Sequence, residues 1–145
     1  MAARLVFLIF FGISCAAQGE GRQGCPYPSS IKYADGYFYK NSAGHRWASP
    51  QVPPGDFIDK FVGAVFVPRK EQELKQGYLE KCIYRTGRDQ LLVALRYTRT
   101  RAGLSMSLTE NLYWRPGKDS FDQDIFQCDD SQPDNCSFTL DHPQY

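Results

Sequence analysis

Short runs rich in aromatic and β-branched residues, separated by turn-forming residues, dominate the chain after residue 20. Apolar and polar positions alternate within several of these runs, which is the period of a strand with one face in a core. Beyond residue 20 there is no long stretch of helical period and no heptad or internal repeat. The pattern predicts a mainly β fold: one small antiparallel β domain over residues 20–145, a sandwich or a curled meander, with one or two short helical segments.

The first predicted hairpin consists of "GYFYK" and "HRWAS" around the loop "NSAG". A four-residue loop places Phe38 opposite Trp47 on one face and Tyr39 opposite Arg46 on the other. We expect the first pair to lie in the core and Arg46 to stack on Tyr39. Tyr37 and Tyr39 are then the candidates for an exposed aromatic platform.

The second predicted hairpin consists of "YLEKCIYR" and "QLLVALRYTR" around the loop "TGRD". This loop aligns Tyr84 with Leu91 and Cys82 with Val93. The predicted core face has Glu80 only at its margin and comprises Cys82, Tyr84, Leu91, Val93, Leu95 and Tyr97.

Turn-forming and capping residues predict the remaining elements. We expect a helical turn capped by Asp56, followed by a strand over 61–67, and a charged connection with one or two helical turns ended by Gly77. After Gly103, "LSMSLTENLYW" predicts one strand, and "IFQC…CSFTL" predicts a last pair of strands joined by a disulfide.

Residues 1–19 have the layout of a secretory signal peptide. Arg4 precedes the apolar stretch 5–13, and small residues follow. The stretch is too short to span a bilayer, which takes about 20 residues. Cleavage is expected after Ala17 or Gly19. Alternatively, "FGISC" resembles a bacterial lipobox, in which Cys15 would become the lipidated first residue.

Four cysteines remain after the signal, an even number that predicts two disulfides in an exported chain. Three connectivities are possible. The polar segment "CDDSQPDNC" favours a short bridge between Cys128 and Cys136, which leaves Cys25 to pair with Cys82. A zinc site would need CxxC or HxxxH spacing, which these cysteines lack.

Charge is unevenly distributed along the chain. Residues 18–114 hold fourteen basic against nine acidic residues, whereas 115–145 hold two basic residues and seven aspartates. The acidic C-terminal segment 115–145 either covers the chain's own basic face or leaves that face for an anionic partner. The candidate binding residues on that face are Tyr37, Tyr39, Arg46, Arg96, Arg99 and Arg101, because guanidinium groups bind phosphate and carboxylate.

Signals for catalysis are sparse. The chain has two histidines, His45 at a hairpin end and His142 near the C-terminus, and it lacks the common hydrolase, metalloprotease and nucleotide-binding motifs. The aspartates of "DSFDQD" lack the spacing of an EF-hand. We therefore predict no catalytic residues, no metal site and no cofactor.

Four segments, "GCPYPSSIKYADGYFY", "HRWASP", "FIDKFVGAVFVP" and "GYLEKCIYR", resemble a group of small exported bacterial proteins of unknown function. The resemblance covers Cys25 to about Tyr97, and its markers are Cys25-Pro26, Trp47 and the Cys82-Ile83-Tyr84 strand. It implies an exported domain in which Cys25 and Cys82 matter together, and it supplies no activity.

The sequence thus predicts a non-enzymatic, exported binding module of the bacterial cell envelope, such as an accessory subunit of a secretion or envelope machine. The alternatives are an inhibitor or immunity-type protein and a small cell-wall glycan hydrolase. The expected partner is a protein or an anionic envelope polymer or lipid surface, not nucleic acid, with membrane attachment only through a lipid anchor at Cys15. We expect a periplasmic or secreted protein, or an outer-membrane lipoprotein.

Overall fold

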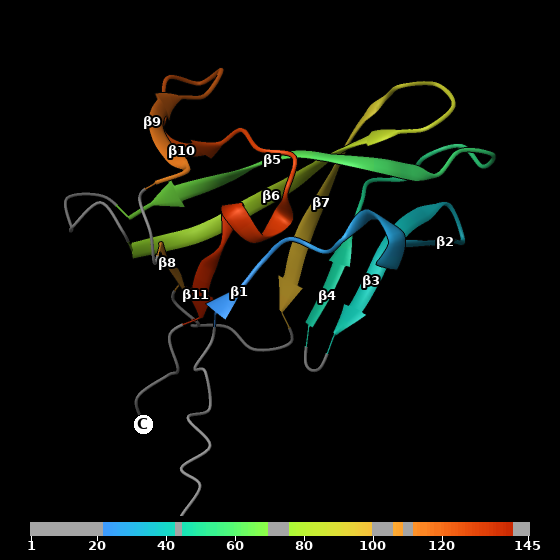
Figure 1. Cartoon of the computed structure of the whole chain (residues 1–145), viewed down its shortest axis with the longest axis horizontal. Helices are drawn as coiled ribbons and strands as arrows, with labels where there is room; N and C mark the ends of the chain where they lie inside the picture. The colour runs from blue at the N-terminus through green and yellow to red at the C-terminus, as the bar shows by residue number, and fades with distance from the viewer. Residues whose placement is uncertain (1–21, 43–44, 70–75, 100–105, 109–111, 141–145) are drawn as a thin grey trace, which may run out of the picture.

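The structure, a computed structural model, describes residues 22–42, 45–69, 76–99, 106–108 and 112–140. These residues form an 11-stranded antiparallel sheet, which confirms the predicted mainly β class (Figure 1). The strands are β1 (Arg22–Gln23), β2 (Lys32–Ala34), β3 (Tyr37–Ser42), β4 (His45–Ala48), β5 (Ile58–Pro68), β6 (Gln76–Thr86), β7 (Leu92–Arg99), β8 (Met106–Ser107), β9 (Trp114–Lys118), β10 (Asp124–Cys128) and β11 (Phe138–Leu140).

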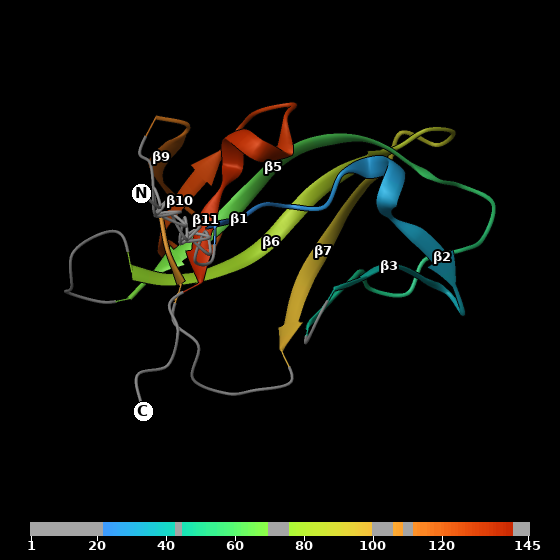
Figure 2. The ribbon, with the colours of Figure 1, turned by 60° about the horizontal axis from the view of Figure 1, so that its bottom comes forward.

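The sheet is open and forks at β6. One edge of β6 pairs with β5 along its length, while its other edge pairs first with β8 and then with β7. From β7 the sheet continues through β4 and β3 to β2, and from β8 it continues through β11 to β1. Beyond β5 it ends in β10 and β9. Figure 2 shows β7, β3 and β2 turning away from β11 and β1, so that the two branches form separate arms.

The core lies between these arms, where the segments before β2 and before β11 cross the sheet. The two disulfides are Cys25–Cys82 and Cys128–Cys136, as predicted. All four half-cystines are buried. Next to the first bridge, the buried Tyr84 hydroxyl donates a hydrogen bond to the Pro26 carbonyl at 2.7 Å. The first bridge thereby holds the segment after β1 against β6, and the second holds the segment before β11 against β10.

The first hairpin has the predicted faces but not the predicted register. Tyr39 lies opposite Ala48, and Ser42 lies opposite His45, so the connection is shorter than the expected "NSAG" loop. The pairing is displaced by two residues, and because side chains alternate with a period of two, the faces are unchanged. Phe38 and Trp47 are buried, as predicted.

The second hairpin shows the same displacement, with Tyr84 opposite Val93 instead of Leu91. Leu91 consequently falls in the turn and is exposed, so its assignment to the core was wrong. An irregularity in the pairing with β5 shifts the alternation near Glu80. As a result Leu79 is buried, whereas Tyr78 is exposed.

Other local predictions are corrected as follows. Asp56 does not cap a helical turn; the helical segments described are two 3₁₀ turns, η1 (Pro28–Ser30) and η2 (Pro133–Cys136). Gly77 lies inside β6, and the residues expected to form its preceding helix, 70–75, lie outside the described residues. Within the described ranges, no helix has the length and apolar character needed to cross a membrane.

The predictions for the strands after Gly103 were also wrong in part. The strand expected from "LSMSLTENLYW" is divided between β8 and the start of β9, with residues 109–111 outside the described ranges. The strands of "IFQC…CSFTL" are not partners, because β10 pairs with β5 and β9, while β11 pairs with β8 and β1. Their disulfide therefore joins two regions of the sheet and not two neighbouring strands.

Candidate binding face

One continuous row of cross-strand neighbours crosses four strands of the β2–β3–β4–β7 arm. Lys32 lies opposite Tyr39, Tyr39 opposite Ala48, and Ala48 opposite Arg96. Directly paired residues share a face of an antiparallel sheet. This is the outer face, since the alternate positions Phe38 and Trp47 point into the core.

A tight turn adds β2, and with it Lys32, to this face. Ala34 pairs with Tyr37, and the two residues between them, Asp35 and Gly36, have φ values of 53° and 90°. Positive φ at both central positions is the geometry of a type I′ turn, for which Asp-Gly is a preferred pair. The "ADGY" signal was present in the sequence, but Lys32 was missed because only the following hairpin was assigned.

The cations on this face are held by local contacts. The Arg46 guanidinium lies 5.0 Å from the centre of the Tyr39 ring, which confirms the predicted stacking. The Arg46 carbonyl accepts a hydrogen bond from the Thr98 hydroxyl at 2.8 Å, which ties β4 to β7. Arg96 approaches the Glu80 carboxylate at 3.7 Å, a loose ion pair in which the Arg96 side chain is 57% exposed and that of Glu80 27%. A long, partly exposed pair of this kind contributes little to stability, so the Arg96 guanidinium stays accessible from solvent.

We call Lys32, Tyr37, Tyr39, Arg46 and Arg96 the basic face. Apart from Lys32, these were predicted binding residues, and the structure places them on one arm of the sheet.

The other predicted binding residues are not part of this description. Arg99 pairs through its backbone with His45 at the end of β7, and its side chain lies outside the described residues. Arg101 and the candidate lipidation residue Cys15 also lie outside them. Tyr97, predicted to lie on the core face, is partly buried against the core and packs its ring 4.9 Å from that of Trp47 and 4.7 Å from that of His45.

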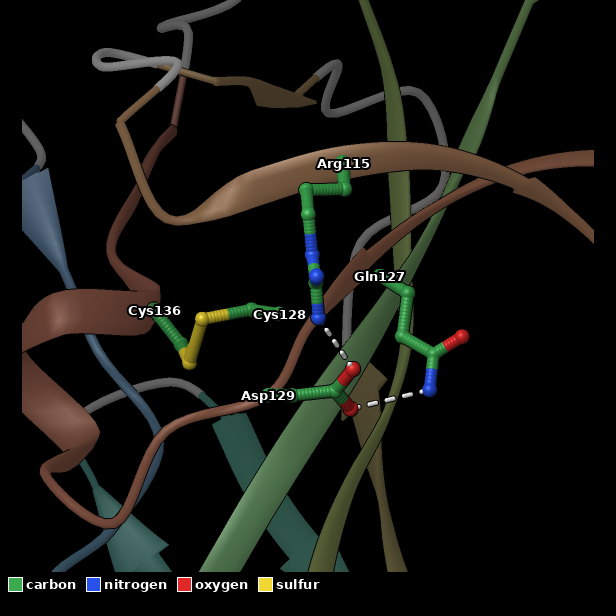
Figure 3. Close-up of polar contacts among 5 residues, drawn as sticks. All are labelled: Arg115, Gln127, Cys128, Asp129 and Cys136. Atoms are coloured by element: carbon green, nitrogen blue, oxygen red, sulfur yellow. Dashed lines mark hydrogen bonds and ion pairs between the residues drawn. A yellow bond between two sulfur atoms is a disulfide. The ribbon is translucent and has the colours of Figure 1, made fainter.

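The described surface also has a hollow away from this face. This hollow, of about 650 Å³, lies beside β5 and the Cys128–Cys136 loop and is lined by Asp59, Asp129 and Asp130 among others. Figure 3 shows the Asp129 carboxylate accepting hydrogen bonds from Arg115 and Gln127, each at 2.9 Å. Within the described ranges, histidine, cysteine and acidic side chains form no group of three suited to a metal ion.

Backbone hydrogen bonds stabilise the charge of Asp56, which lies beside the loop between β6 and β7. The Asp56 carboxylate accepts hydrogen bonds from the backbone N–H groups of Phe57, Arg88 and Asp89. Desolvation opposes the charge on Asp56, but these hydrogen bonds outweigh it and hold the pKa of its carboxyl well below the usual range. In the core, burial raises the pKa of the Tyr84 phenol, which therefore stays neutral.

The family model described as "Protein of unknown function (DUF3757)" matches residues 20–139. Comparisons with curated proteins and with solved structures find no match.

Proposed function

The chain belongs to this family of unknown function, and we propose that it is a non-enzymatic binding module that docks an acidic protein surface on its basic face. The observation that carries the proposal is the row Lys32–Tyr39–Ala48–Arg96, with Arg46 stacked on Tyr39. The face belongs to a regular sheet, whereas the hollow beside β5 is lined in part by aspartates. A flat, cationic and aromatic surface suits a protein partner better than a polymer chain lying in a groove.

The energetics favour such a partner. Arg46 is already ordered by its stacking on Tyr39, so less side-chain entropy is lost when it binds a carboxylate. Tyrosine and arginine are the residue types that most often dominate binding energy at protein interfaces. Glu80, which pairs with this face, holds Arg96 only loosely at 3.7 Å.

Two disulfides fit an oxidising, exported compartment. We propose further that residues 1–19 direct export in a bacterium, and that the mature chain acts in the periplasm or at the envelope, as an accessory subunit of a larger assembly. The lipobox-like "FGISC" supports a lipid anchor at Cys15 as one form of that attachment.

The test is capture of neighbours in cells by a photo-reactive amino acid placed at Tyr37, which lies on the exposed margin of the face. We expect cross-links to one acidic protein, and their loss in the double variant Arg46→Glu/Arg96→Glu. The matched control is Arg69→Glu/Arg115→Glu, which changes the net charge equally at exposed positions away from the face and should keep the cross-links. Equal loss in both variants would refute docking by this face and indicate a general charge effect. Release of soluble fragments from purified cell wall by the protein would refute the non-enzymatic function.

A further inference from the structure

Large apolar side chains are exposed at the tip of the β6–β7 hairpin and in the segment that packs beside it. Phe57 is 51% exposed, Leu91 54% and Leu92 62%. Phe57 belongs to the segment before β5, but its carbonyl accepts a hydrogen bond from the Gly87 N–H at 2.9 Å. Its ring lies against Gly87 so closely that a Cβ there would fall 2.1 Å from it. We call Phe57, Leu91 and Leu92 the apolar tip.

The apolar tip is not one face of the sheet. Leu92 pairs with Arg85 and alternates with the buried Val93, so Leu91 and Leu92 project to opposite sides of the hairpin. Figures 1 and 2 both show this hairpin loop at an outer end of the molecule, next to the segment that enters β5. A flat protein partner would cover one side of such a tip. A fluid apolar medium would cover both sides.

The backbone of the tip can be transferred from water to a lipid interface at low cost. Burying an unpaired backbone N–H is costly, and a lipid interface provides few acceptors. Here five of the six backbone donors from Thr86 to Leu91 are used within the fold. The hydrogen bonds run from Thr86 N–H to the Leu91 carbonyl, from Gly87 N–H to the Phe57 carbonyl, from Arg88 and Asp89 N–H to the Asp56 carboxylate, and from Leu91 N–H to the Thr86 hydroxyl.

The charges around the tip nearly balance. The cations are Lys60, Arg85 and Arg88, and the acids are Asp56, Asp59 and Asp89. The Asp56 carboxylate is satisfied by backbone donors, and Arg85 donates to the Gln90 carbonyl at 3.0 Å. Attraction to anionic lipid is therefore weak at this site, and apolar contact must carry the binding.

From these observations we propose that the apolar tip inserts into the interfacial layer of a phospholipid bilayer. Each of the three side chains transfers apolar area from water to the lipid boundary. Three side chains give a weak, reversible contact, which orients a domain already held at the membrane or raises its local concentration there.

The experiment places a tryptophan at the tip, Leu92→Trp, and follows its emission with phosphatidylcholine vesicles whose acyl chains carry bromine. The native Trp47 and Trp114 are buried and provide a constant background. We expect a blue shift and quenching. The control is Phe121→Trp at the β9–β10 hairpin tip, where Phe121 is 89% exposed but neighbours Asp119, Asp122 and Asp124. This reporter should show neither effect.

A second experiment identifies the residues responsible and distinguishes lipid binding at the tip from binding at the basic face. Leu91→Ser/Leu92→Ser should lower the partition coefficient of the otherwise native chain about tenfold, as expected for losing two partly buried leucines. Arg46→Glu/Arg96→Glu should leave it within about twofold on phosphatidylcholine. The proposal is overturned if the leucine variant binds vesicles as well as the native chain. It is equally overturned if the Phe121→Trp reporter is the one quenched, or if the leucine variant loses only a protein cross-link.

Discussion

The two disulfides offer a direct test of how this open sheet is stabilised. Cys25 and Cys82 are separated by 57 residues, whereas Cys128 and Cys136 are separated by 8. By loop-closure entropy, the long bridge stabilises the fold by about 4 kcal/mol and the short one by about 2.5 kcal/mol. We expect replacement of both cysteines of a pair by alanine to destabilise the fold more for the long pair.

The difference between the two variants is more informative than either value. All four half-cystines are buried, so each double replacement removes a similar apolar volume from the core. That shared term cancels in the comparison, which leaves an expected difference of about 1.6 kcal/mol from loop length alone. The assay is equilibrium unfolding in urea under oxidising conditions, with the free energy extrapolated to water.

An equal loss in both variants, or a larger loss for the short pair, would refute this reasoning. It would mean that the bridges act mainly through packing in the folded state and not through the unfolded chain. A fall in the urea slope of the Cys25/Cys82 variant alone would indicate instead that the segment around Cys25 separates from the core before the sheet unfolds.

Two further predictions concern single residues. A Cβ at Gly63 would lie 2.4 Å from the Cys128 carbonyl oxygen, whereas one at Gly117 would meet its nearest atom at 3.9 Å. Gly63→Ala should therefore lower the free energy of unfolding by about 1–3 kcal/mol, and the control Gly117→Ala by less than about 0.5 kcal/mol. The pKa of Asp56 is lower in the fold than in the unfolded chain, so its contribution to stability is complete above about pH 4 and is lost as the pH falls further. Denaturation at about pH 7 and about pH 3 should show Asp56→Asn destabilised at the higher pH and closer to the native chain at the lower one; an equal difference at both would contradict that assignment.

The sequence predicted the faces of strands better than their partners. Phe38 and Trp47 were assigned to the core correctly, although their hairpin pairs two residues away from the expected register. A displacement of two preserves the alternation, so hydrophobic pattern alone cannot distinguish these registers. Loop length decides between them, and "NSAG" is compatible with more than one turn.

Features that depend on the extent of the core could not be read from local pattern. Leu91 has the same position in the alternation as Val93, yet it is exposed because the core ends before the hairpin does. The burial of Leu79 depends on an irregularity in the pairing of β6 with β5, which no local sequence motif predicts. Within the basic face, Lys32 was recoverable from the Asp-Gly turn, whereas Arg96, three strands away in the same row, was found from charge alone.

The basic face and the apolar tip share β7, and this limits how a partner can be arranged. Leu92 and Arg96 are four residues apart and occupy equivalent positions in the alternation, so Arg96 lies about 13 Å along the strand from the tip. If the tip contacts a bilayer, a protein docked on the basic face must itself lie close to the lipid surface. The partner then need not bind tightly, because confinement of both proteins to one surface raises their effective concentration. A photo-reactive residue at Leu92 should therefore label lipid, while one at Tyr37 labels the protein partner.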